Sequence, residues 1–223
     1  RAVGHAGTLD PLATGVLVVL TEEATKLSPF LTESDKHYLA WVTLGVGTPT
    51  LDAEGPISAT VDASHITKDM IEAALPKFLE LSEQLPPQYS AIKRAGVKGY
   101  EAARRGETLE LPPRPAGYNK IELLEFQPSR NNLSTHFALT PEAIWRAKDR
   151  GITFNLPALL QDGPTALFYL SVKAGTYIRA FARDLGAALG VPAHLSGLVR
   201  TRAGKSGLDQ AMRLEDIVNH SGL

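Results

Sequence analysis

Apolar residues in this 223-residue chain fall in short runs bounded by glycine and proline, and this pattern most constrains its fold. Runs of this length are typical of strands, whereas apolar residues three to four positions apart are typical of amphipathic helices. The runs predict strands at 16–20, 38–44, 119–126 and 166–172. The helical spacing predicts helices at 22–31, 66–79, 140–151 and 176–189. Because strands and helices do not alternate strictly, we expect an α+β fold with a mixed sheet.

Composition excludes several classes of protein. The chain is 43% hydrophobic, enough to bury a real core in one large domain or two small ones. No apolar run approaches the roughly 20 residues of a membrane span. The chain contains no cysteine, which excludes disulfides, thiolate zinc sites and cysteine nucleophiles and fits a reducing compartment. Its net charge of −1 argues against a uniformly basic nucleic-acid binder but allows a local basic face.

The stretch GHAGTLDPLATGVLVVL (4–20) contains a single acid, Asp10, followed by Pro11. An Asp-Pro pair favours a helix start, with Asp10 as N-cap and Pro11 at the first helical position. A carboxylate held in this way also suits a nucleophile or a general base, so the local pattern leaves both roles open. His5 lies nearby, but no HxH, HxxxH or DxD pattern accompanies it, and we predict no metal site.

Two stretches combine cations with polar or aromatic residues. YSAIKRAGVKGYEAARRGE (89–107) interleaves two tyrosines with five cations, among them Lys93. LVRTRAGK (198–205) adds Arg200, Arg202 and Lys205. Tyrosines stack on bases and cations meet phosphates, so we interpret the two clusters as a polarised RNA-binding surface; a solvated helix face or loop is the alternative. The glycines match neither a dinucleotide-binding nor a P-loop pattern, and no cofactor is expected.

The 4–20 stretch resembles the signature of the TruB-type tRNA pseudouridine synthases, and further matches run through nearly the whole chain. They are DKHYLAWVTLGVGTPTLDAEG (35–55), QLPPQYSAIKRAGVKGYEAARRGE (84–107), AGTYIRAFARDLGAALGVPAHLSGLVRTRAG (174–204) and MRLEDI (212–217). The resemblance implies a single catalytic domain over 1–223, with a mixed, largely antiparallel sheet, flanking helices and an RNA-binding cleft. The segment at about 86–114 would be an insertion that grips RNA. The implied activity is isomerisation of a uridine in the T loop of tRNA, position 55, to pseudouridine.

The same resemblance assigns roles to individual residues. Asp10 would be the nucleophile, Arg179 would pair with it and keep it ionised, and Tyr38 would stack on the target uracil. Leu198 would line the pocket, and His5 would stack in the RNA loop that the flipped nucleotide leaves. Further substrate-binding candidates are Tyr177, Lys93, Asp52, Arg200 and Arg202, although turn chemistry also explains Asp52. Attack at C1′, attack at C6 and a glycal route all remain open.

The chain also departs from the family pattern. The family's usual N-terminal strand and C-terminal RNA-binding domain are not found in it, as would be expected if the chain is a fragment. The stretch 128–163, with its helix at 140–151, is longer than expected, and we assign it no function. The expected partner is the T stem-loop of tRNA. We expect a cytoplasmic monomer without a membrane or an obligatory protein partner.

Three alternatives compete with this interpretation. A non-enzymatic RNA-binding or tRNA-folding module would use the same basic clusters without needing Asp10. The catalytic subunit of a guide-RNA pseudouridylation complex is the second, although the 89–107 stretch favours a stand-alone enzyme. An Asp-dependent hydrolase is disfavoured, because no second acid or metal cluster accompanies Asp10.

Overall fold

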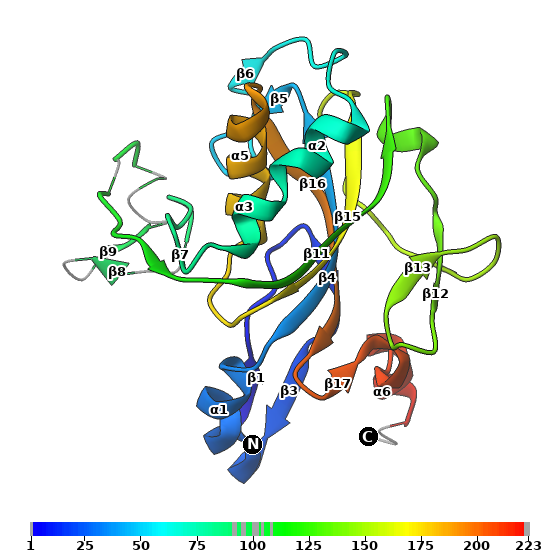
Figure 1. The fold of residues 1–223 in the computed structure, drawn as a ribbon. Helices are drawn as coiled ribbons and strands as arrows, with labels where there is room; N and C mark the ends of the chain where they lie inside the picture. The colour runs from blue at the N-terminus through cyan, green and yellow to red at the C-terminus, as the bar shows by residue number, and fades with distance from the viewer. Residues whose placement is uncertain are drawn as a thin grey trace.

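A computed structural model describes residues 2–90, 93–94, 97–99, 103, 105–107 and 109–220. Its centre is a six-stranded sheet in the order β11-β15-β4-β16-β17, with β2 paired to β16 (Figure 1). The strands are β2 (Ala13–Gly15), β4 (Lys36–Leu44), β11 (Tyr118–Gln127), β15 (Thr165–Val172), β16 (Ala193–Ala203) and β17 (Ser206–Gly207). The β2–β16 pair is parallel and the other pairs are antiparallel, which confirms the α+β prediction.

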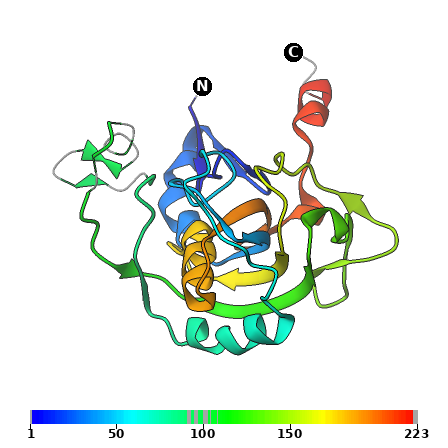
Figure 2. The ribbon, with the colours of Figure 1, turned by 90° about the horizontal axis from the view of Figure 1, so that it is seen from above.

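Both faces of the sheet are covered, and this explains its long apolar strands. One face packs against α5 (Ile178–Leu189), α2 (Lys68–Ala74) and α3 (Pro76–Leu79). The other packs against a small sheet of β12 (His136–Leu139), β13 (Trp145–Ala147) and β14 (Ile152–Thr153). Seen from above, α5 and this small sheet lie on opposite sides of the central sheet (Figure 2). Every residue of β15 is buried, as expected for a strand between two layers.

The helices largely follow their sequence signals. Thr67 caps α2 by accepting the backbone N–H of Met70, and Pro76 divides the predicted 66–79 helix into α2 and α3. The predicted 176–189 helix is α5, which ends at Gly190 with a φ of 74°, a conformation that glycine adopts without strain. Its apolar stripe packs into the core, so this part of the prediction is confirmed.

Three predictions at the N-terminus are wrong in part. Asp10 begins no helix; the chain makes a turn and continues into β2. The run 16–20 is not a buried strand, because β3 (Val18–Thr21) pairs with β1 (Val3–Ala6) in a hairpin that leaves Val19 56% exposed. The 22–31 segment forms η1 (Glu22–Leu27) and the short α1 (Ser28–Thr32), and Phe30 is exposed rather than part of the core.

The helix predicted at 140–151 is also wrong. Thr140 to Ile144 form the turn of a hairpin between β12 and β13, with Ala143 at a φ of 57°. Phe137 and Trp145 point into one apolar cluster with the central sheet. The cluster explains the outcome, because burying these aromatic residues in strands outweighs a weak local helix signal.

The remaining elements are short. They are β5 (Val46–Gly47), β6 (Ala59–Thr60), β7 (Glu83–Gln84), β8 (Lys93–Arg94), β9 (Val97–Lys98), β10 (Arg114–Pro115), η2 (Arg130–Asn132), η3 (Leu208–Gln210) and α6 (Leu214–His220). The strands β7 and β10 pair where the 86–114 segment leaves the body of the protein, and β8 and β9 project away from it (Figure 1). Within the described ranges, no helix is long and apolar enough to cross a membrane.

Candidate active site

Asp10 lies in the loop between β1 and β2 and is held by Arg179 from the first turn of α5. Arg179 Nε donates to Asp10 Oδ2 at 2.9 Å, and Nη2 donates to Oδ1 at 3.0 Å. Two parallel bonds of this kind fix the plane of a carboxylate as well as its position. The arginine side chain is 7% exposed and the aspartate side chain 32%. Asp10 is therefore an oriented carboxylate that a substrate can still reach.

A second carboxylate, Asp52, lies against the same arginine. Its Oδ2 is 3.7 Å from Arg179 Nε, and its side chain is 4% exposed. Arg179 Nη1 also donates to the carbonyl of Thr50 at 3.1 Å. Asp52 Oδ1 accepts the backbone N–H of Glu54, so the predicted turn chemistry is present too. Asp52 thus belongs to the site and anchors the cation that orients Asp10.

Two tyrosines, Tyr38 and Tyr177, lie close enough to Asp10 for its negative charge to raise the pKa of their phenols. Burial raises the pKa of Tyr38, nearby Arg200 opposes the rise, and the charge of Asp10 adds to it. Burial likewise raises the pKa of Tyr177. The positive charge of Arg179 opposes this rise, and the negative charge of Asp10 increases it. Both phenols are therefore neutral at pH 7. Leu198 on β16 pairs with Ala13 of β2 and is 4% exposed, which places it in the core beside the loop.

Gln84 is a residue of the site region that the sequence analysis did not single out. Its Oε1 accepts the backbone N–H of Tyr177 at 2.9 Å, and its Nε2 donates to the Tyr177 carbonyl at 3.2 Å. Nε2 also donates to the Tyr118 hydroxyl at 2.9 Å. Gln84 thereby fixes the backbone just before α5, two residues from Arg179. A lone glutamine in a polar stretch carries no local signal for this role.

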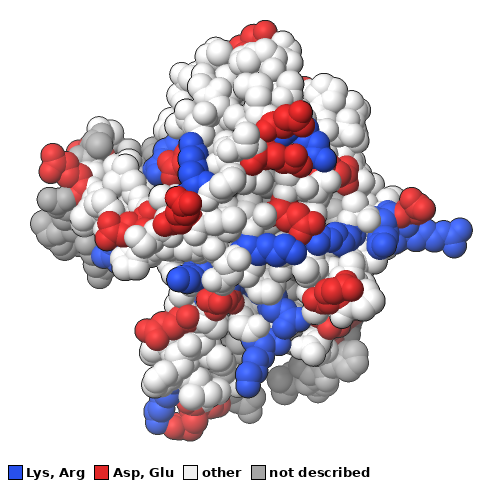
Figure 3. All heavy atoms as spheres, viewed as in Figure 1, with Lys and Arg blue, Asp and Glu red and all other residues white. Residues whose placement is uncertain are grey.

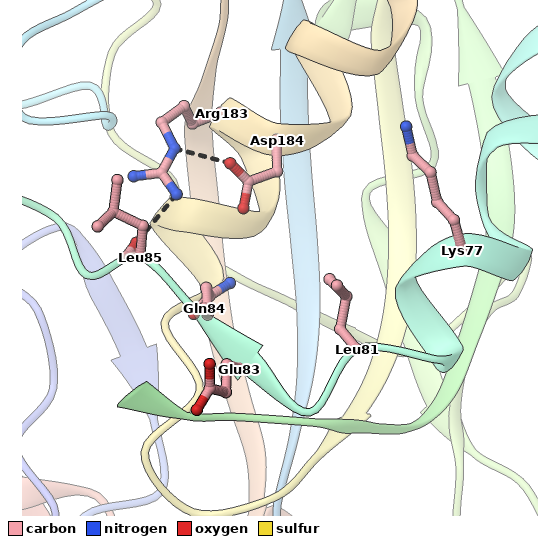
Figure 4. A pocket seen from close by; sticks show the side chains of 7 residues that line it. All are labelled: Lys77, Leu81, Glu83, Gln84, Leu85, Arg183 and Asp184. Carbon is pink, nitrogen blue, oxygen red and sulfur yellow. Dashed lines mark hydrogen bonds and ion pairs between the residues drawn. The ribbon is translucent and has the colours of Figure 1, made fainter. Parts of the chain in front are cut away.

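Gln84 also lines a hollow of about 370 Å³ (Figure 4). Its lining residues are Lys77, Leu81, Glu83, Gln84, Leu85, Arg183 and Asp184. Arg183 bridges the carboxylate of Asp184 and the carbonyl of Leu85. The hollow therefore lies beside the base of the 86–114 segment, and the Asp10 carboxylate does not line it.

The basic cluster predicted at 198–205 is not a surface patch. Most of it belongs to the central strand β16, and Arg200 is 1% exposed. Arg202 pairs in register with His37. The His37 ring contacts Tyr169 in the apolar cluster on the far face from α5, so Arg202 does not join the Asp10 group. Positive and negative side chains are interspersed among the described residues on the face seen in Figure 3, so these residues form no polarised surface there.

Two other predicted binding residues lie apart from this group. His5 is exposed on the β1–β3 hairpin, where its carbonyl accepts a bond from Ser28. The side chain of Lys93 lies outside the described residues, as do those of most of its basic neighbours. Among the described side chains, no group of three or more His, Cys, Asp or Glu residues could hold a metal ion.

The fold matches the solved structures of two complexes. A Cbf5–Nop10–Gar1 complex gives a TM-score of 0.61 at 26% identity, over 99% of this chain and 46% of that one. An H/ACA RNP bound to a substrate RNA containing 2′-deoxyuridine gives 0.58 at 25% identity, over 99% of this chain and 44% of that one. The α+β sheet with its flanking helices is the pseudouridine synthase fold.

Sequence comparison names the family. The profile described as "TruB family pseudouridylate synthase (N terminal domain)" matches residues 1–140. The tRNA pseudouridine synthase B of Thermus thermophilus is 55% identical over 219 residues, which cover 97% of this chain and 69% of that protein. The corresponding protein of Deinococcus radiodurans is 48% identical over 217 residues, 97% of this chain and 70% of its own length. The chain belongs to the TruB family of pseudouridylate synthases.

Proposed function

We propose that this chain isomerises uridine 55 in the T loop of tRNA to pseudouridine, with Asp10 as its catalytic residue. The observation that carries the proposal is the carboxylate of Asp10, clamped by two bonds from Arg179 and one-third exposed. The relatives with 48–55% identity are named for this activity on tRNA.

The reaction needs one oriented anion and no redox partner. The N1–C1′ bond of the uridine breaks, the uracil rotates, and a C5–C1′ bond forms. C5 then loses its proton to a base or to water, and N1, which carried no proton in uridine, takes one up. Atoms and electrons balance within the nucleotide and water. Asp10 acts by attack at C1′, by attack at C6, or as the base of a glycal route. Arg179 supports all three because it holds the carboxylate in one orientation.

The target base must leave the T loop to reach Asp10. Extruding a base costs a few kcal/mol, which stacking in the site partly offsets. Tyr38, within the electrostatic reach of Asp10, is the aromatic residue proposed to stack on the uracil. Leu198 supplies an apolar wall next to it. The 86–114 segment is proposed to grip the T arm, with Lys93 and Tyr177 as further contacts.

A stand-alone enzyme is the favoured form of this activity. The solved complexes with guide-RNA proteins are 25–26% identical to the chain, whereas the tRNA enzymes reach 48–55%. We therefore propose a cytoplasmic monomer whose partner is tRNA. A pure RNA-binding module has no use for the accessible Asp10–Arg179 pair, since gripping RNA needs cations rather than a carboxylate.

The test uses a tRNA transcript with tritium at C5 of its uridines. Tritium release is compared for the parent, Asp10→Asn, and the control Asp62→Asn, which changes an exposed carboxylate in a turn. We expect stoichiometric release from one uridine by the parent and the control, and none by Asp10→Asn, with tRNA binding retained in all three. Release by Asp10→Asn at the parent rate would refute the role of Asp10. Binding without release by any of the three would leave an RNA-binding module.

A further inference from the structure

Arg200 lies at the base of the loop that carries Asp10, in the interior of the protein. Its Nε donates to the carbonyl of Val16 at 2.7 Å, and its Nη2 donates to the carbonyl of Gly7 at 2.9 Å. Its Nη1 donates to the carbonyl of Thr8 at 3.4 Å. One planar guanidinium thus joins the two ends of the loop, on either side of Asp10.

The main chain of the same residue holds the loop as well. The N–H of Val16 donates to the carbonyl of Arg200 at 2.8 Å, and Arg200 pairs in parallel register with Gly15. Gly15 has a φ of 104°, and a Cβ there would lie 2.2 Å from the Arg200 carbonyl oxygen. Only glycine permits this approach. The far end of the loop is therefore pressed directly onto β16.

Arg200 also acts on the tyrosine proposed to stack on the substrate. It lies opposite Tyr38 in the β4–β16 register. Its charge and a side-chain hydrogen bond both oppose the rise in the phenol pKa that burial causes. The same guanidinium is therefore placed between the Asp10 loop and Tyr38.

Burying a cation is costly unless its donors are satisfied. Here they point at main-chain carbonyl oxygens, and a fixed fork of donors can serve several such acceptors at once. A lysine carries the same charge and three donors, but all three are on one nitrogen, so it lacks the fork that places separate nitrogens at the carbonyls of Val16 and Gly7. This geometry is specific to arginine and does not serve RNA phosphates, because the side chain is 1% exposed.

We propose that Arg200 is a positioning residue of the isomerisation: it holds both ends of the 7–16 loop, so that Asp10 meets Arg179 and the target base in the productive geometry. This inference rests on the proposed function. Arg200 acts through the loop that carries Asp10 and does not touch the substrate.

The test compares Arg200→Lys with a matched control, Arg130→Lys. Arg130 is also a partly buried arginine that donates to two main-chain carbonyls, those of Ser196 at 2.6 Å and Pro157 at 2.7 Å. Its partners hold the 128–163 segment and not the Asp10 loop. Both variants are assayed by tritium release for kcat and KM, and by hydrogen exchange of the amides of residues 7–16.

A displacement of about 1 Å at a reacting group can cost about 100-fold in rate. We therefore expect Arg200→Lys to lower kcat by about 10- to 100-fold, with KM changed less than about threefold, and to raise amide exchange in the loop. Arg130→Lys should keep kcat within about twofold and leave loop exchange unchanged. Parent-like kcat in a folded Arg200→Lys, or a rise in KM alone, would overturn the inference.

Two further outcomes are distinguished. If Arg200→Lys does not fold by circular dichroism, Arg200→Gln is judged by the same criteria, since it fills the site without a charge. If the parent shows no tritium release, the proposed function fails. Parent-like loop exchange in Arg200→Lys then refutes the positioning role independently.

Discussion

Replacing Arg179 by methionine tests how the site is held together. The variant removes the fork on Asp10 and leaves Asp52 as a buried carboxylate without a nearby cation. At the observed 3.7 Å, the attraction between Arg179 and Asp52 is about 4.5 kcal/mol in an effective dielectric constant of about 20. Breaking a buried pair by removing one partner typically costs about 3–5 kcal/mol. We expect the free energy of unfolding to fall by about 3–4 kcal/mol and the melting temperature by about 10 °C.

A double-mutant cycle with Asp52→Asn isolates the pair. Neutralising Asp52 in the Arg179→Met background removes the unpaired charge. The double variant should therefore lose about 2 kcal/mol less free energy of unfolding than the two single variants lose together. Urea unfolding followed by tryptophan fluorescence is suitable, because Trp41 and Trp145 both lie in the core.

The control for this cycle is Arg183→Met, one turn further along α5. Arg183 makes an ion pair with Asp184, and their side chains are 28% and 32% exposed, respectively. Losing this pair should lower the free energy of unfolding by about 1 kcal/mol or less. A loss below about 1 kcal/mol for Arg179→Met, or additivity within about 0.5 kcal/mol in the cycle, would refute the reasoning.

Three further predictions concern stability. Gly15→Ala should destabilise the protein by about 3 kcal/mol or more in urea unfolding, because a Cβ would meet the β16 main chain at 2.2 Å and φ is 104°. His194 is buried, and its Nδ1 donates to the carbonyl of Val46. Burial lowers the pKa of its imidazole below the ordinary 6.5, so below pH 6.5 the unfolded chain binds a proton at His194 more readily than the native state does. The parent should therefore lose stability as pH falls below about 6.5, and His194→Gln should reduce that slope by up to about 1.4 kcal/mol per pH unit. Gln84→Leu should lower the free energy of unfolding by about 2–3 kcal/mol and speed hydrogen exchange of the Tyr177 amide, because that amide loses its acceptor. An exchange rate equal to that of the parent would contradict the role of Gln84.

Some predictions from local patterns agree with the structure. The 38–44 and 166–172 runs are strands because burial between two layers selects continuous apolar residues. Thr67 and Pro76 mark helix boundaries by chemistry that involves only their neighbours in sequence. The family resemblance also paired Asp10 with Arg179, and the structure joins the two side chains by two hydrogen bonds.

Local patterns failed where a distant partner decides the outcome. The Asp10-Pro11 pair predicts a helix cap. In the structure the carboxylate instead accepts hydrogen bonds from Arg179, which lies 169 positions away in the chain. The 198–205 stretch is predicted to form a basic surface, because arginines interrupt its apolar pattern. Arg200 is buried in β16 only because loop carbonyls more than 180 positions away satisfy its donors.

The sequence by itself therefore determined the family and the strands and helices whose burial shows as a periodic pattern, and it identified Asp10 as the candidate catalytic residue. The resemblance also paired Arg179 with Asp10, but only the tertiary structure placed Asp52 against the same cation and Arg200 beneath the loop. The physical reason is that propensity and periodicity act over a few residues, whereas a buried ion pair or cation exists only when distant segments bring its partners together.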